Sequence, residues 1–144
     1  MIVKLLAPQI PTFWETIKYA VKHADGVKDR ELPSYLTELL HALLNDKAQC
    51  WVRLSEKKEV YALCVTRIMH NPQRDEKYLY VQTLFSWVPQ ANGVWEENFG
   101  FIREYAKNTG CKYIGCMSNN KRAFEIYESL GMKEESRIFS LRID

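Results

Sequence analysis

The chain has 144 residues, of which 47% are hydrophobic and 26% charged, and this globular composition excludes an intrinsically disordered chain. Its 20 basic and 18 acidic residues give a formal net charge of +2, so we expect no basic face for nucleic acid. The apolar runs are far shorter than the roughly 20 residues of a membrane helix, so no membrane partner is expected. We predict one domain over 1–144 and, because the start lacks a signal-peptide pattern, a cytoplasmic location.

The four cysteines give no sign of a metal site or a disulfide framework. No pair has the Cys-x-x-Cys spacing, and the three histidines are scattered through the chain. We therefore predict no metal ligands and interpret the cysteines as free thiols, with Cys116 as a small buried hydrophobe.

Residues 1–44 predict one strand and two helices. The strand covers residues 1–6. From Thr12, apolar residues recur at helical spacing until Gly26, and Pro33 opens a second helix whose leucine stripe ends at Leu44. The loop between these helices carries Asp25, Asp29 and Glu31.

Residues 49–88 change to the pattern of three successive strands, at 49–54, 59–69 and 77–88. Alternation in the third strand predicts one face made of Leu79, Val81, Thr83, Phe85 and Trp87. The opposite face is also substantially apolar, with Tyr78, Tyr80, Leu84 and Val88.

The last third predicts two helices and the strands between and after them. A helix over 93–108 precedes a short strand over 111–117. Asn120 caps a second helix that ends at Leu130 and Gly131, and strands finish the chain over 132–143. The order β-α-α-β-β-β-α-β-α-β predicts an α/β (α+β) fold, in which a mixed, mainly antiparallel twisted sheet has helices on both faces.

The junction after Val88 has the layout of a phosphate site. A strand leads through Gln90, Ala91, Asn92 and Gly93 directly into a helix that starts near Val94. Unpaired backbone N–H groups and the positive end of the helix dipole then face the same point, which suits a pyrophosphate.

Two motifs in this region resemble the GNAT superfamily of N-acetyltransferases. The family loop Gln/Arg-x-x-Gly-x-Gly/Ala is matched by Gln90 and Gly93, although Trp95 stands at the last position. The family motif Asn-x-x-Ala-x-x-x-Tyr-x-x-x-Gly-Phe fits residues 120–132, with Met132 in place of Phe. The order of elements also resembles the family over the whole chain.

The resemblance implies acetyl-CoA as co-substrate and an amine as acceptor. It places the pantetheine arm on Leu84, Phe85, Ser86 and Trp87, and the pyrophosphate on the amides of Ala91–Val94, with Gln90 in the same loop. It also implies that Asn120, Lys121 or Arg122 meets the nucleotide phosphates.

The resemblance makes Tyr127 the proton donor to the departing thiolate, although a residue that only packs its ring fits the sequence equally well. Many family members carry a Glu on the strand before the loop, whereas this strand offers Gln82, Thr83 and Ser86. We therefore expect a water held by Gln82, or an amine that arrives deprotonated.

Several alternatives stay open. Trp95 either continues the stripe of Phe99, Ile102 and Ala106 or fills the phosphate site. Asp25, Asp29 and Glu31 either attract a cationic amine or form a solvated loop. The chain is either an N-acetyltransferase or a non-catalytic GNAT-fold binding or assembly protein, for example a phage or accessory protein. For the non-catalytic alternative we predict a homodimer or a partner complex that involves this sheet or the C-terminal strand 137–143.

Overall fold

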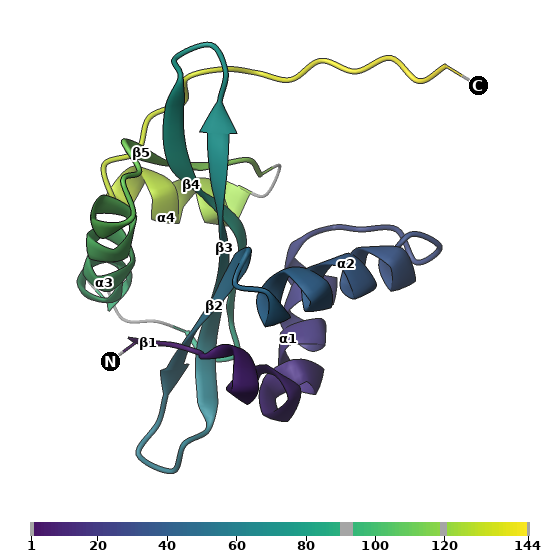
Figure 1. Ribbon diagram of the computed structural model, residues 1–144, viewed down its shortest axis with the longest axis vertical. Helices are drawn as coiled ribbons and strands as arrows, with labels where there is room; N and C mark the ends of the chain where they lie inside the picture. Colours follow the sequence, from purple (N-terminus) through teal and green to yellow (C-terminus); the bar gives the residue numbers. More distant parts are fainter. Residues whose placement is uncertain (1, 90–93, 119–120, 144) are drawn as a thin grey trace.

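The computed structural model describes residues 2–89, 94–118 and 121–143. Figure 1 shows its elements, with α1 and α2 packed on one side of the sheet and α3 and α4 on the other. In chain order these are β1 (Ile2–Lys4), the 3-10 turn η1 (Ala7–Gln9), α1 (Ile10–Ala24), α2 (Leu32–Leu44), β2 (Ala48–Leu54), β3 (Val60–Asn71), β4 (Glu76–Ser86), α3 (Val94–Asn108), β5 (Tyr113–Cys116) and α4 (Lys121–Ser129).

The five strands form one sheet in the order β1-β2-β3-β4-β5. Every neighbouring pair is antiparallel except β4 and β5, which are parallel. The parallel pair is joined through α3, as a crossover connection requires. The predicted fold class, a mixed and mainly antiparallel sheet with helices on both faces, is confirmed.

Each face of the sheet has its own hydrophobic core. Ile17, Val21 and Leu39 of α1 and α2 are fully buried against Val52 and Val65 of the sheet. On the other face, α3 packs through the apolar stripe predicted from the sequence, Phe99, Ile102 and Ala106, against residues that include Trp51, Leu79 and Val81. Burial of these two stripes holds the helices to the sheet.

The helix ends agree with the glycine signals in the sequence. Gly110 and Gly131 have φ of +83° and +85°, a backbone conformation that suits glycine. The N–H of Cys111 bonds to the Ala106 carbonyl and that of Met132 to the Tyr127 carbonyl. Such bonds close a helix with an αL residue, so the predicted end of α4 at Gly131 is confirmed.

The predicted alternation of β4 is wrong beyond Val81. The β3–β4 register pairs Thr66 with Val81 and Val65 with Thr83, so Gln82 is an extra residue that forms a β-bulge. An extra residue moves the side chains that follow it to the opposite face of the sheet. Leu79 and Val81 consequently pack on the α3 side, whereas Phe85 and Trp87 pack on the α1 side.

The strands predicted over 132–143 are also wrong, since residues 130–143 contain none. A strand exists only where its N–H and C=O groups pair with a neighbour. Figure 1 shows this segment running away from the sheet toward the C-terminus. Four apolar side chains on it are 74–92% exposed: Ile138, Phe139, Leu141 and Ile143.

None of the helices that the structure describes is long and apolar enough to cross a membrane.

Candidate active site

Strands β4 and β5 separate at one defined point. Their parallel pairing runs from Tyr78 and Tyr113 to Val81 and Cys116, where it ends. The next residue of β4 is Gln82, the bulge residue. From Gln82 to Phe85, β4 has β3 as its only strand partner among the described residues, so its other edge can offer backbone N–H and C=O groups to a ligand.

Tyr127 lies beside the end of β5. It is 8% exposed, and its hydroxyl forms a hydrogen bond with the thiol of Cys116, the last residue of β5 that pairs with β4. Burial, with the neighbouring thiols of Cys116 and Cys64, raises the pKa of Tyr127. The phenol therefore stays protonated at neutral pH, as a proton donor must.

Asp25 lies on the other face of the sheet and is bonded to the bulge. It is the residue directly after α1, and Gly26 (φ +67°) turns the chain away from the helix. Thr83 Oγ1 donates to the two carboxylate oxygens at 2.8 and 2.9 Å, and Gln82 Nε2 lies 3.4 Å from Oδ2. The bulge lets the consecutive side chains of Gln82 and Thr83 reach the same carboxylate.

Tyr35 of α2 donates the shortest hydrogen bond to Asp25, with 2.6 Å between its hydroxyl oxygen and Oδ2. Gln82 Nε2 also donates to the Tyr35 oxygen, at 2.9 Å. No sequence pattern singles out Tyr35, which stands directly before the leucine stripe of α2.

The Gln82 amide is held in one orientation. Its oxygen accepts a 2.6 Å hydrogen bond from Arg67 Nε, and Arg67 forms two further bonds of 2.7 and 2.6 Å with the Glu38 carboxylate. Both ends of the amide are thus committed to protein partners. The structure places Gln82 at the opening as a link between Arg67 and Asp25.

Burial is the main influence on the ionisable groups of this network. It raises the pKa of Asp25, although the hydrogen bonds from Tyr35, Thr83 and Gln82 and the charge of Arg67 oppose the shift. Burial and the Asp25 carboxylate raise the pKa of Tyr35. The same two causes raise the pKa of Tyr80, which also interacts with Cys116. A carboxylate with a raised pKa at an opening is typical of a proton acceptor.

Aromatic side chains continue this face beyond Thr83. Phe85 and Trp87 of β4 are in edge contact with ring centroids 4.9 Å apart, and Tyr19 of α1 stacks on Trp87 at 5.9 Å. His23, two residues before Asp25, lies 4.2 Å from the Tyr19 ring. A hollow borders this aromatic cluster, lined by Phe13, Tyr19 and Trp87 among others.

The predicted cofactor residues fall into three groups. Leu84, Phe85, Ser86 and Trp87 lie on β4 and just after it, beyond the point of separation. Gln90, Ala91, Asn92, Gly93 and Asn120 lie outside the described residues, as does the side chain of Val94. Lys121 and Arg122 are exposed in the first turn of α4, whereas Glu96 and Glu97 place two acidic side chains in the first turn of α3.

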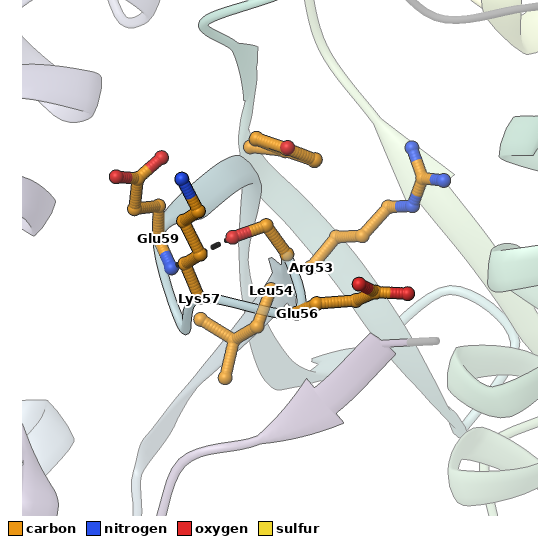
Figure 2. Close-up of a pocket in the computed structure, with 7 residues that line it drawn as sticks. Arg53, Leu54, Glu56, Lys57 and Glu59 are labelled. Atoms are coloured by element: carbon orange, nitrogen blue, oxygen red, sulfur yellow. Dashed lines mark hydrogen bonds between the residues drawn. The ribbon is translucent and has the colours of Figure 1, made fainter.

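A second hollow lies at the β2–β3 turn, apart from the residues of the opening. Its lining includes Arg53, Glu56, Lys57 and Glu59, and Figure 2 shows Arg53 and Glu56 on one side of the turn with Lys57 and Glu59 on the other. Each side thus carries one cationic and one acidic side chain. The mixture gives this hollow no net charge that would select a ligand.

No protein-family model matches the chain, and no curated protein sequence does. Solved structures do match along its whole length. A predicted acetyltransferase with acetyl-CoA from Clostridium acetobutylicum has a TM-score of 0.76 at 13% identity, covering 99% of this chain and 95% of that one. The enzyme AAC(6')-Iy, in complex with a bisubstrate analogue of CoA and acetylneamine, has a TM-score of 0.72 at 16% identity, covering 100% and 97%.

A third match is the ribosomal-protein-alanine N-acetyltransferase from Brucella melitensis, with a TM-score of 0.71, 10% identity and 99% coverage of both chains. The matches confirm the resemblance in fold, because the chain has the fold of GNAT-type acetyltransferases.

Proposed function

We propose that the protein is an N-acetyltransferase, which moves the acetyl group of acetyl-CoA to a primary amine. The observation that carries this proposal is the separation of β4 from β5 directly after Val81 and Cys116. Within the described part of the chain it leaves the edge of β4 at Gln82–Phe85 without a second neighbouring strand, beside two candidate proton-transfer groups, Tyr127 and the network at Gln82. The fold, shared with structures that contain CoA derivatives, supports the same conclusion.

We propose that the backbone of Leu84–Trp87 binds the pantetheine arm, since amide groups of an extended ligand can pair with the edge of a strand. The loop Gln90–Val94 would then bind the pyrophosphate, and Asn120, Lys121 and Arg122 the nucleotide phosphates. When bound, acetyl-CoA supplies the activated acetyl group as a thioester. The protein's own task is to orient the amine, remove its proton and protonate the departing sulfur.

Tyr127 suits the last of these tasks. Its buried hydroxyl already bonds to a sulfur atom, that of Cys116, at the point where the strands separate. A phenol has an ordinary pKa of about 10, and a thiol about 8.5, so transfer to a thiolate requires help from the local field. Burial acts on both groups, because it penalises a free thiolate in the same place and also raises the pKa of Tyr127.

The alternative is a binding or assembly protein that keeps the fold without the reaction. Glu96 and Glu97 favour it, since they place negative charge near the end of α3 where a pyrophosphate would bind. The two functions differ in one consequence, because only the enzyme consumes acetyl-CoA.

The test is a transfer assay with acetyl-CoA and a panel of primary amines, read as released CoA thiol and as acetylated amine by mass spectrometry. The proposal expects both products in equal amounts, with CoA inhibiting competitively against acetyl-CoA. Rates no higher than without protein, for every amine at millimolar acetyl-CoA, would leave the binding protein as the better description.

A further inference from the structure

We propose that Asp25 accepts the proton of the incoming ammonium group, because β4 carries Gln82 and Thr83, and no glutamate, beside the opening. We further propose that the acceptor is an amine with a single positive charge, whose apolar body lies on the aromatic cluster of Tyr19, Phe85 and Trp87. Both statements rest on the proposed function and assign the acceptor side of the same site.

Asp25 lies next to the point where β4 and β5 separate. Asp25 bonds to Gln82 and Thr83, the two residues that follow the last β4–β5 pair. Tyr80 interacts with the Asp25 carboxylate and also with Cys116, the partner of Tyr127. The carboxylate and the Tyr127 hydroxyl therefore flank one opening, the first on the α1 and α2 side and the second on the α3 and α4 side.

The Asp25 carboxylate has room for a further hydrogen bond. A carboxylate has about four lone-pair positions for hydrogen bonds. Tyr35, Gln82 and Thr83 donate to Oδ2, whereas Oδ1 has one donor within the described part of the chain, the Thr83 hydroxyl. A lone pair of Oδ1 is thus available to an ammonium group, while the other bonds keep the carboxylate in place.

The charges around Asp25 favour an acceptor with a single positive charge. The carboxylate of Glu38 is already paired with Arg67, so it does not add to the negative charge that faces the opening. The charged and titratable groups around Asp25 are Tyr35 from α2, Arg67 from β3 and Tyr80 from β4, with His23 on its own helix. One carboxylate matches one ammonium, and the Glu38 carboxylate, already paired with Arg67, is not available to a second cation on the acceptor.

The surface beside Asp25 is aromatic. Phe85 follows Thr83 by two residues on the same face, and its ring lies 6.2 Å from that of His23, which precedes Asp25 by two. The rings of Tyr19, Phe85 and Trp87 form one continuous contact. Such rings bury the carbon chain of an amine and attract its ammonium group.

The proton balance is as follows. Asp25 takes one proton from the ammonium and becomes a neutral acid, which leaves the nitrogen lone pair free to form the C–N bond with the acetyl carbon. The C–S bond breaks, and the sulfur takes its electron pair together with the Tyr127 proton. The nitrogen loses a second proton, which restores Tyr127, and Asp25 returns its own to solvent. The sum is an amide, free CoA thiol and one released proton.

The first experiment compares pH profiles of kcat/KM for wild type and Asp25→Asn, with 2-phenylethylamine as acceptor. Wild type should reach a plateau between the pKa of Asp25 and that of the amine, because the ammonium binds to the carboxylate. The variant can use only the neutral amine, so its kcat/KM should rise tenfold per pH unit up to the amine pKa. Near pH 7 it should lose about 10²-fold, as is typical of a lost general base. The control Asp75→Asn removes an exposed carboxylate from the β3–β4 turn and should follow wild type.

The second experiment needs no turnover. We expect 2-phenylethylamine alone to shift the backbone NMR signals of Gln82, Thr83 and Phe85 in wild type, more strongly than spermidine at equal concentration. Asp25→Asn should weaken this binding at least tenfold while its other signals stay in place.

Unchanged amine binding, or a variant profile that keeps the wild-type plateau, would overturn the inference while transfer by wild type continued. A wild type that binds the amine through Asp25 but transfers nothing would instead overturn the proposed function. That result would also overturn the role of Asp25 as proton acceptor, whereas its role in binding the amine would be supported.

Discussion

The Tyr127 hydroxyl is hydrogen-bonded to the Cys116 thiol, and this bond ties the last turn of α4 to the end of β5. Cys116 is also the last residue of β5 paired with β4, so the bond marks the point where the strands separate. A residue that only packed its ring would not need its hydroxyl at this place.

Replacing Tyr127 by Phe removes this hydroxyl and keeps the ring. If Tyr127 protonates the departing thiolate, kcat should fall about 10²-fold or more with little change in acetyl-CoA affinity, because a proton donor acts only in the transition state. The free energy of unfolding should fall by about 1 kcal/mol for the lost hydrogen bond. Steady-state kinetics and urea unfolding measure the two effects.

The matched control for this variant is Tyr105→Phe. Tyr105 is a half-buried tyrosine of α3 in edge contact with Trp51. Its loss of a hydroxyl should leave kcat unchanged. A kcat for Tyr127→Phe equal to that of the control would identify Tyr127 as a packing residue.

Replacing Tyr35 by Phe should move the pH profile rather than abolish activity. The Tyr35 hydrogen bond is the largest of the influences that lower the pKa of Asp25. Without it the pKa rises further, so the low-pH limb of kcat/KM should move to higher pH. A carboxyl NMR titration of Asp25 in the free protein checks the same shift. A limb that stays in place, or moves to lower pH, would show that Asp25 does not control it.

Asp25 and Glu38 should affect stability in opposite pH directions. Asp25 has a raised pKa, so its contribution is fully present below its ordinary pKa of 3.8 and is lost as pH rises through the folded value. Glu38 has a lowered pKa, because Arg67 bonds to it. Its contribution is present above its ordinary pKa of 4.5 and is lost as pH falls through the folded value.

Urea unfolding of Asp25→Asn and Glu38→Gln across pH 3–7 tests these signs. As pH rises, wild type should lose stability relative to Asp25→Asn and gain it relative to Glu38→Gln. The second effect should stay below about 1 kcal/mol, because Glu38 is largely exposed. A constant difference from wild type for Asp25→Asn would mean that its pKa is the same folded and unfolded.

The sequence predicted the elements well where periodicity determines them. The stripe of Phe99, Ile102 and Ala106 and the glycine ends of the helices are local patterns. The bulge at Gln82 is not, because it depends on register with β3. The Asp25 network joins residues 10 to 58 positions apart, and only the folded chain brings them together. The resemblance indicated Tyr127, whereas Tyr35 and Arg67 carried no signal in the sequence.

The segment 137–143 should mediate self-association. It is extended and apolar, with Phe139 and Leu141 almost fully exposed, and β5 is the last strand at its edge of the sheet. We predict that this segment pairs with β5 of a second copy, which would bury both. Sedimentation over a wide concentration range should show a dimer for wild type and a monomer for the double variant Phe139→Ser, Leu141→Ser. A wild type that stays monomeric throughout would contradict this prediction.

The central claim is that acetyl-CoA binds where β4 and β5 separate, and calorimetric titration of wild type with acetyl-CoA, combined with amide NMR, tests it most directly. We expect saturable binding of one ligand per chain, with the largest signal shifts at residues 82–87, in β4 and just after it, and smaller ones at the β2–β3 turn. No heat and no thermal shift at millimolar acetyl-CoA, or shifts confined to residues outside this opening, would contradict it.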